Sequence, residues 1–442
     1  MVEMETKIKV AERSRSYERY KDSGVAWLGE IPEHWEALAN KFIFYLKKNQ
    51  VGKKSADYDL LSLTLKGIII RNLENGGKFP AEFDTYQEVK KGDFVFCLFD
   101  VEETPRCVGL SDYNGMITGA YTVMEPNENF DRSFLYYFYL NLDADKRMKP
   151  LYTGLRNTIS KDNFFAFKTF VPPLSEQTAI AHFLDDKTTK IDEAITIKQQ
   201  QISLLKERKQ ILIHKAVTHG LDASVSLKDS GVEWIGEIPV GWKITYLKRY
   251  CLKVTDGSHH SPQTQYEGKS YISVKDVNEF GEIDTINCKK INQKDFDDLA
   301  RNGCKPKKND ILLTKDGTIG RAAIVNTDND FVVLSSLGII TPDLKEFDSK
   351  FLRYYLISPL CVSQMNSLIA GSALTRLTIE KINRLFVIIP PLSEQKEIVV
   401  YLDDGSKKIE TAISLKQQEI TKLKEYKSSL INSVVTGKVK VC

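Results

Sequence analysis

The chain has 442 residues, of which 42% are hydrophobic and 27% are charged, an ordinary composition for a globular protein. Its length predicts about two to four domains. The formal net charge of +3 neither requires nor excludes a nucleic-acid partner, so any basic surface must be local. No apolar run approaches the ~20 residues of a membrane span, so we expect no membrane partner.

Residues 1–20 are polar and rich in Arg, Lys and Glu, which predicts an N-terminal arm or short helix. This segment lacks the apolar core of an export signal, so we expect a cytoplasmic protein. The seven cysteines include no Cys-x-x-Cys pair, which is typical of reduced thiols.

A fifteen-residue segment, KDSGVAWLGEIPEHW, follows at 21–35, and KDSGVEWIGEIPVGW occurs at 228–242. Eleven of the fifteen positions are identical, so we call both segments the tryptophan motif. We expect their tryptophans to anchor the following body in its core rather than to contact a ligand. These residues are Trp27, Trp35, Trp234 and Trp242.

The bodies that follow, 36–171 and 243–389, differ in sequence although their borders match. Short apolar runs between turn residues predict strands, and amphipathic runs predict helices. In the first body the expected strands are 60–65, 67–70 and 94–99, and the expected helix is 134–142. In the second body the expected strands are 308–314 and 322–325, and the expected helix is 351–356.

Pro-Pro-Leu-Ser-Glu-Gln follows each body, at 172–177 and again at 390–395. The two prolines end the preceding strand because they cannot lie inside a helix. Ser175 and Ser393 are the expected N-caps, and each is followed by a glutamate in the positive first turn of a helix.

Each of these segments continues into a helical pattern whose apolar residues recur at alternating steps of four and three, the a/d seam of a coiled coil. The pattern over 186–218 predicts a helix of roughly 32 residues, about 48 Å long. The second copy repeats it at an offset of 218 residues, including lysines at the same two seam positions. The predicted seam residues are Leu184, Ile191, Ile195, Ile202, Leu205, Leu212, Leu402, Ile409, Ile413, Ile420, Leu423 and Leu430.

The sequence therefore predicts a tandem repeat of α/β (α+β) class, with two globular bodies separated by two long helices that pair in opposite directions. The first helix leads from body one to body two, and a partner of equal length returns. The predicted division is an N-terminal arm 1–20, a first body 21–171, a first spacer helix 172–220, a second body 221–389 and a second spacer helix 390–442.

Unlike bodies on a duplicated frame indicate two readers of different targets, because recognition usually lies in loops on a rigid scaffold. Two polar turns, 256–262 and 315–321, offer amides, hydroxyls and cations to phosphates or base edges. The alternative is that these turns and cations are simply solvated. His259 and His260 lack further ligands at metal-binding spacing, so we predict no metal site.

The candidate recognition residues share a polar or cationic side chain near a predicted turn or near the border before Pro-Pro. In the first body they are Lys66, Arg71, Arg106, Tyr113, Arg156, Asn157 and Lys161. In the second body they are Ser258, His259, His260, Lys275, Lys315, Thr318, Arg321, Arg376, Thr378 and Lys381.

The duplicated Pro-Pro-Leu-Ser-Glu-Gln, the heptad helix ending Ala-Val-Thr-His-Gly-Leu-Asp222 and the tryptophan motif resemble the specificity subunits of type I restriction–modification systems. The resemblance covers essentially the full chain. It implies two target-recognition domains that each read one half of a bipartite double-stranded DNA sequence, separated by an antiparallel coiled coil. It also implies no catalysis by this chain, two methyltransferase subunits held by the helices, and restriction subunits that join them. S-adenosylmethionine, ATP and Mg would then be bound by those partner subunits.

The alternative is a DNA-acting enzyme, a nuclease or methyltransferase in its own right. A DNA methyltransferase would have a glycine-rich cofactor loop and Asn/Asp-Pro-Pro followed by an aromatic residue, whereas both Pro-Pro pairs here precede Leu. Nuclease-like Glu-x-Lys occurs at 88–90, but also at 207–209 and 425–427 on the predicted helices. A purely structural coiled-coil protein would not need two large, unlike bodies.

Overall fold

The computed structural model describes residues 16–72, 83–326, 330–370 and 376–441, so most of the predicted N-terminal arm lies outside the described residues. By its internal contacts the chain divides into two units. Unit 1 comprises Met1–Lys198 with Gln418–Cys442, and unit 2 comprises Gln199–Gln417. Each long helix is shared between the units, which therefore differ from the predicted bodies and spacers; those bounds stay a prediction.

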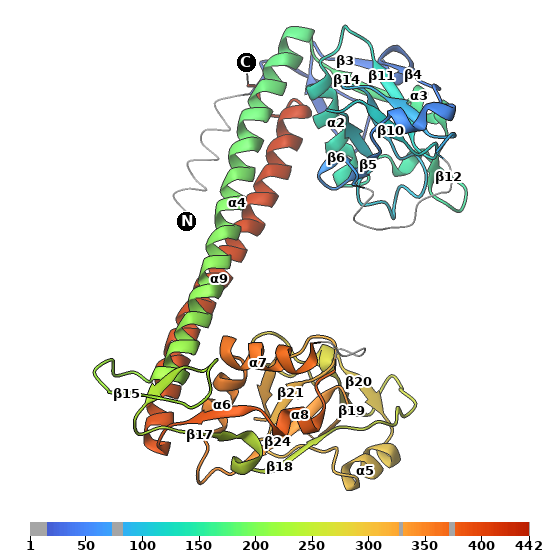
Figure 1. The fold of residues 1–442 in the computed structure, drawn as a ribbon. Coiled ribbons are helices and arrows are strands. Elements are labelled where there is room, and N and C mark those ends of the chain that lie inside the picture. The colour runs from blue at the N-terminus through green and yellow to red at the C-terminus, as the bar shows by residue number, and fades with distance from the viewer. Residues whose placement is uncertain (1–15, 73–82, 327–329, 371–375, 442) are drawn as a thin grey trace. The chain divides into compact units, whose positions relative to one another are not determined.

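Unit 1 is built around a four-stranded antiparallel sheet (Figure 1). Its strand order is β4 (Phe44–Leu46), β11 (Thr122–Pro126), β8 (Phe94–Phe96) and β9 (Val108–Leu110). Smaller antiparallel pairs are β1 (Tyr20–Asp22) with β2 (Glu30–Pro32), β5 (Leu61–Thr64) with β6 (Gly67–Ile70), β7 (Gln87–Val89) with β10 (Gly115–Ile117), and β12 (Tyr152–Thr153) with β13 (Thr158–Ile159). Its short helices are α2 (Arg132–Ala144) and α3 (Lys161–Ala166).

Aromatic side chains fill the core between this sheet, α2 and α3. Phe96 lies 5.2 Å from the Tyr139 ring and 4.8 Å from the Phe164 ring, between ring centroids. Such edge-to-face and tilted aromatic pairs add to the gain from burial. The buried Tyr139 hydroxyl donates to Asn40 Oδ1 at 2.7 Å, so this polar atom among the aromatic rings has a partner.

Unit 2 contains a four-stranded antiparallel sheet in the order β18 (Cys251–Asp256), β24 (Leu337–Pro342), β21 (Ile311–Thr314) and β22 (Ala322–Ile324). Beside it, β20 (Lys289–Ile291), β19 (Lys269–Ile272) and β23 (Phe331–Val333) form a three-stranded sheet in which β19 and β23 are parallel. A further antiparallel pair is β15 (Leu227–Asp229) with β16 (Glu237–Pro239). The short helices are α5 (Gln293–Arg301), α6 (Ser349–Leu356), α7 (Pro359–Ile369) and α8 (Ile379–Asn383).

The strand after each tryptophan motif pairs with the strand before each Pro-Pro. In unit 1 these are β3 (Glu36–Ala39) and β14 (Lys168–Val171), and in unit 2 they are β17 (Lys243–Tyr246) and β25 (Phe386–Ile389). Both ends of each body are therefore hydrogen-bonded together where the long helix begins. The predicted strands 60–65 and 67–70 and the predicted helices 134–142 and 351–356 are confirmed by β5, β6, α2 and α6.

The long helices are α4 (Leu174–His219, 46 residues) and α9 (Leu392–Val435, 44 residues), both longer than predicted. The prediction that Ser175 and Ser393 are N-caps is wrong, because both serines lie inside the first helical turn. The Pro173 carbonyl accepts from the amides of Glu176 and Gln177, so the helix begins directly after the prolines.

In each unit the two long helices lie side by side and run in opposite directions (Figure 1). In unit 1, Asp192 pairs with Lys427 and Lys198 pairs with Glu419, both at 2.6 Å. In unit 2, Lys209 pairs with Glu410 at 2.6 Å. Higher residue numbers on α4 meet lower numbers on α9, as an antiparallel pair requires. Lys198, Lys209 and Lys427 occupy predicted seam positions, so the contact between the helices accommodates these lysines through acidic residues on the facing helix.

The predicted seam residues are the protected face of both helices. Leu184 and Leu402 are fully buried, Ile191, Ile195, Ile409 and Ile420 are 9% exposed or less, and the other six are partly buried. In the middle part of the helices, apolar residues off the seam such as Ile197 and Leu204 are open to solvent, at 53% and 63%. The pattern of steps in the sequence therefore indicated the buried face.

We expect Ile195→Asp to lower the free energy of unfolding by about 3 kcal/mol, because it buries an unpaired carboxylate on the facing surface of α4. Ile197→Asp is the matched control on the exposed face, with an expected change within about 0.5 kcal/mol. Urea unfolding followed by circular dichroism measures both. Equal effects of the two substitutions would contradict the seam assignment.

Candidate nucleic-acid interface

A buried tryptophan connects each body to the first turn of a long helix. The indole Nε1 of Trp35 donates to Glu176 at 3.1 Å, and that of Trp242 donates to Glu394 at 2.9 Å. Each indole ring is almost fully buried, so its N–H needs this partner. In unit 1 the Glu176 carboxylate also contacts Tyr17 and His34.

The expectation of core anchoring holds for Trp35 and Trp242 and is wrong for Trp234, which is 47% exposed. Trp234 lies on the turn between β15 and β16. Its ring centroid lies 6.3 Å from that of Phe386. Trp27 is partly buried under the guanidinium of Arg147, 4.9 Å from the ring centroid.

A tyrosine makes a second contact between each body and a long helix. The Tyr137 hydroxyl donates to Asp185 at 2.7 Å, and the Tyr354 hydroxyl donates to Asp403 at 2.8 Å. Burial raises the pKa of Tyr354 to about 12 and also raises the pKa of Tyr137. Both hydroxyls therefore stay protonated donors at neutral pH.

Glutamines of the two Pro-Pro-Leu-Ser-Glu-Gln segments make a third contact of the same kind. Gln177 Oε1 accepts from the Asp131 amide at 2.9 Å, and Gln395 Oε1 accepts from the Asp348 amide at 2.8 Å. Asp131 and Asp348 cap α2 and α6, so these bonds fix the start of each body helix to the start of a long helix.

An arginine–aspartate pair lies at the same place in both four-stranded sheets. Asp100 follows β8 and Asp316 follows β21, the third strand in each sheet order. Arg156 Nε lies 3.0 Å from Asp100, and Arg376 binds Asp316 through two nitrogens at 2.7 and 2.8 Å. The Arg156 guanidinium holds the pKa of Asp100 below its usual range, and Asp316 raises the pKa of Arg376.

In unit 2 the two predicted polar turns meet at Asp256, the last residue of β18. The Asp256 carboxylate contacts His259 Nε2 at 3.1 Å and Lys315 Nζ at 3.2 Å. Asp316, which follows Lys315 in the chain, binds Arg376. The amide of the neighbouring Leu377 donates to the Lys315 carbonyl at 2.9 Å. The structure thus brings residues 256–260, 315–316 and 376 into one cluster.

Two candidates in this cluster are corrected by their burial. Lys315 is 2% exposed and Ser258 is 5% exposed, so neither side chain reaches a ligand on the surface. Lys315 neutralises the Asp256 carboxylate, and the Ser258 hydroxyl donates to the His260 carbonyl at 2.6 Å. Both shape the turn that presents the exposed His259 side chain.

The remaining candidates of unit 2 have separate places. The hydroxyl of Thr378 caps α8, and Lys381 lies in the first turn of that helix. Arg321 Nη1 donates to the Val277 carbonyl at 3.1 Å, so this arginine orders a neighbouring loop. Thr318 and Lys275 are exposed.

In unit 1 the candidates lie in several places. Lys66 is exposed in the turn between β5 and β6, and Arg71 follows β6. Arg106 lies near that turn, with Nη2 3.4 Å from the Leu65 carbonyl.

Arg156 and Asn157 lie near one another: Arg156 binds Asp100, and Asn157 Nδ2 donates to Glu103 at 3.1 Å. Lys161 is exposed at the start of α3, and Tyr113 is 41% exposed.

Sequence reasoning selected the arginines but missed Asp100, Asp256 and Asp316, the carboxylates that hold cations in place. A signal for two of them was present. The segments KGDFVFCLFD and KNDILLTKD both carry an aspartate directly after the apolar strand, at Asp100 and Asp316.

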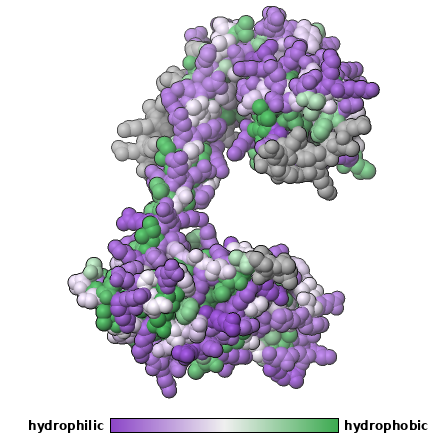
Figure 2. All heavy atoms as spheres, viewed as in Figure 1, coloured by the Kyte–Doolittle hydropathy of each residue, from purple (hydrophilic) through white to green (hydrophobic). Residues whose placement is uncertain are grey.

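The described residues include no group of three or more His, Cys, Asp or Glu side chains placed to hold a metal ion. No helix within the described ranges has both the length and the apolar character to cross a membrane. The visible faces of both units in Figure 2 are largely hydrophilic, with scattered hydrophobic residues between the polar ones.

Comparison with known sequences finds a match to the family model described as the type I restriction modification DNA specificity domain, over residues 110–207 and 256–424. The matched residues make up more than half of the chain.

Relatives include the putative type I restriction enzyme MjaX specificity subunit of Methanocaldococcus jannaschii, 26% identical over 439 residues, or 94% of this chain and 96% of that protein. The type I restriction enzyme EcoBI specificity subunit of Escherichia coli is 28% identical over 258 residues, 55% of this chain and 54% of that protein.

A solved structure from work on complex assembly and conformational transition of the type I R-M system has a TM-score of 0.64 to this chain. It is 15% identical and the match covers 92% of this chain and 98% of that one, so the likeness concerns the fold. With the duplicated contacts between bodies and helices and the family match over both units, the chain belongs to the family of type I restriction modification DNA specificity domains.

Proposed function

We propose that this chain is the non-catalytic DNA-specificity subunit of a type I restriction–modification complex, in which the body of each unit reads one half of a bipartite DNA sequence. The observation that supports this most is that two bodies with different loops are attached to the long helices in the same way. The four-stranded sheets of both bodies have corresponding strand orders, and both bodies make the same Trp–Glu, Tyr–Asp and Gln–amide contacts to a long helix. The remaining strands and loops of the two bodies differ.

We further propose that the chain is an internal repeat and that α4 and α9 form an antiparallel coiled coil, which sets the distance between the two half-sites. The ion pairs Lys209–Glu410 and Asp192–Lys427 support this, because they are related by the 218-residue offset of the sequence repeat. A lysine at a seam position costs stability but fixes register, because a shifted helix would leave its charge unpaired.

The proposed partners are double-stranded DNA, two methyltransferase subunits and restriction subunits, in the cytoplasm. We assign S-adenosylmethionine, ATP and Mg²⁺ to those partner subunits. For S-adenosylmethionine the support is that both Pro-Pro pairs of this chain precede Leu rather than the aromatic residue of a methyltransferase motif. The chain itself would supply sequence recognition and assembly.

The ion-paired arginines are our main candidates for direct DNA contact. A bidentate contact to aspartate occupies two of the five guanidinium N–H groups, so Arg156 and Arg376 keep donors for a phosphate or a guanine edge. The aspartates would orient each fork before DNA binds. Both arginine side chains are accessible, at 72% and 43%.

The purified chain is expected to bind DNA but neither to methylate nor to cut it. Methylation should begin when the methyltransferase subunits are added, because the cofactor site lies there. Transfer of labelled methyl groups from S-adenosylmethionine to duplex DNA measures this. Methylation or cleavage by the chain alone would favour the alternative, an enzyme in its own right.

Exchange of residues 243–389 for the equivalent body of a relative is expected to change one half of the recognised sequence and leave the other half intact. The reason is that each body has its own core and loops. Mapping of methylated bases before and after the exchange measures the outcome. A change in both halves would contradict modular reading.

Arg376→Ala is expected to weaken specific DNA binding about tenfold, the size of one lost bidentate or phosphate contact. Arg301→Ala is the matched control, because Arg301 is an exposed arginine that also pairs with an aspartate, Asp298. Fluorescence anisotropy at several salt concentrations gives both affinities and salt slopes. Equal losses for the two variants would contradict a specific role for Arg376.

A further inference from the structure

The loop 278–282 of unit 2 has a fixed conformation of its own. The Asn278 side-chain oxygen accepts from the amides of Phe280 and Glu282, both at 3.0 Å, and its nitrogen donates to the Glu282 carboxylate at 2.7 Å. A bridge between Val277 and Ile283 closes the base of the loop. A loop with this many internal bonds transmits a contact at its tip to the body behind it.

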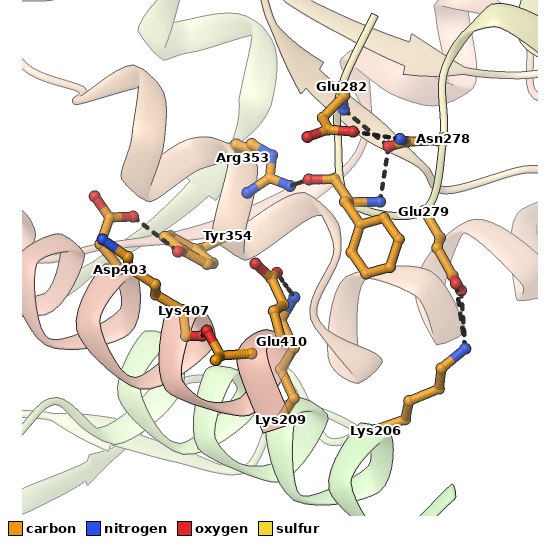
Figure 3. A network of polar contacts seen from close by, with 12 residues as sticks. Lys206, Lys209, Asn278, Glu279, Glu282, Arg353, Tyr354, Asp403, Lys407 and Glu410 are labelled. Atoms are coloured by element: carbon orange, nitrogen blue, oxygen red, sulfur yellow. Dashed lines mark hydrogen bonds and ion pairs between the residues drawn. The ribbon is translucent and has the colours of Figure 1, made fainter. Parts of the chain in front are cut away.

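Arg353 of α6 holds this loop against the four-stranded sheet. Its Nε donates to the Ala322 carbonyl of β22 at 3.0 Å, and its Nη2 donates to the Phe280 carbonyl (Figure 3). Gly281 has φ +80, and a Cβ there would lie 2.3 Å from Arg353 Nη2 and 2.7 Å from the Ala322 carbonyl oxygen. Glycine is therefore needed for the arginine to reach the loop.

The tip of the loop contacts the long helix α4. Lys206 Nζ lies 3.2 and 3.4 Å from the two carboxylate oxygens of Glu279, as the labelled side chains in Figure 3 show. Both side chains are about half exposed, so the pair alone contributes little to stability. The position of the pair matters more than its strength. It connects the loop to α4 at a place separate in sequence from the Trp242–Glu394 contact, which connects the body to α9.

These contacts form a closed ring within unit 2. Tyr354, next to Arg353 on α6, donates to Asp403 of α9, and Glu410 of α9 binds Lys209 of α4. We call the set Lys206, Glu279 and Arg353 the helix–loop network. The body of unit 2 therefore contacts α4 through the loop and α9 through α6.

The Arg353 contacts of the helix–loop network have no equivalent side chain at the matching position of unit 1. Tyr137 and Tyr354 occupy equivalent positions, since each donates to the matching aspartate of a long helix. The residue before each is Tyr136 in unit 1 and Arg353 in unit 2. A tyrosine hydroxyl has a single proton to donate, so it cannot hold two carbonyl oxygens as the guanidinium does.

We propose that the helix–loop network fixes the rotation of the second body about the helix pair, and so sets where its half-site falls along the DNA helix. Lys206, Glu279 and Arg353 are positioning residues that act without touching DNA. The inference rests on the proposed function. It adds a second determinant of half-site spacing to the length of the helices themselves.

The test uses the complete complex with its methyltransferase subunits. Duplexes carry the sequence that the unaltered complex methylates, with the gap between half-sites kept or changed by one base pair. The measured quantity is the ratio of methylation rates on the kept and changed gaps. We expect Lys206→Glu and Glu279→Lys each to reduce this preference roughly five- to tenfold, and the double variant Lys206→Glu/Glu279→Lys to restore it.

Lys215→Glu is the matched control, since it makes the same charge change at an exposed position of α4 and should keep the preference. Lys206→Gln, a milder variant that only removes the charge, should shift the ratio in the same direction by less. Melting temperatures of all variants should agree within a few degrees, because the changed side chains are exposed.

An unchanged gap preference in both single variants, with normal methylation of the kept gap, would overturn the inference and leave the proposed function intact. Failure of the double variant to restore the preference would also overturn it, because the effect would not come from this contact. If the unaltered complex methylated no bipartite sequence, the proposed function itself would fail.

Discussion

The structure depends on two buried indole N–H groups that each require an acceptor. Trp35 and Trp242 are almost fully buried, and the indole N–H of each donates to a carboxylate in the first turn of a long helix, at Glu176 and Glu394. An unmade bond at such a site would cost about 1–3 kcal/mol, so the body and the helix must meet in one arrangement. Each body is thereby fixed to a helix and not merely connected to it by the chain.

The helix pair carries that constraint along its length. The facing surfaces of the two helices are apolar at most seam positions. Where a seam position is a lysine, an acidic residue of the other helix pairs with it, as Glu410 does with Lys209. Apolar burial supplies the stability of the pair, while the charged positions oppose a sliding of one helix along the other. In our proposal the register of the two helices sets the spacing between the two DNA half-sites. The helix–loop network of unit 2 fixes the rotation of the second body about the helix pair.

The long helices and the borders of the two bodies could be predicted because they are repeated and periodic in the sequence. The seam residues and the tryptophan motifs follow from repeats and periodicity, whereas the strand pairs β3–β14 and β17–β25 were seen only in the structure. The N-caps at Ser175 and Ser393 were wrong because the Pro173 carbonyl already accepts the first helical amides, which no local serine signal reveals. The burial of Lys315 and the pairing of Arg156 and Arg376 with aspartates could not be predicted, because these contacts join loops that are distant in sequence. The sequence showed only that an aspartate follows the apolar strand in each body.

Genome-wide mapping of the bases that the assembled complex methylates tests the central claim most directly, because it reads what both bodies recognise at once. The account predicts two short, unlike half-sites separated by unread bases of one constant number, with a methylated base in each half. A single uninterrupted sequence, two identical half-sites, or a gap of variable length would contradict it.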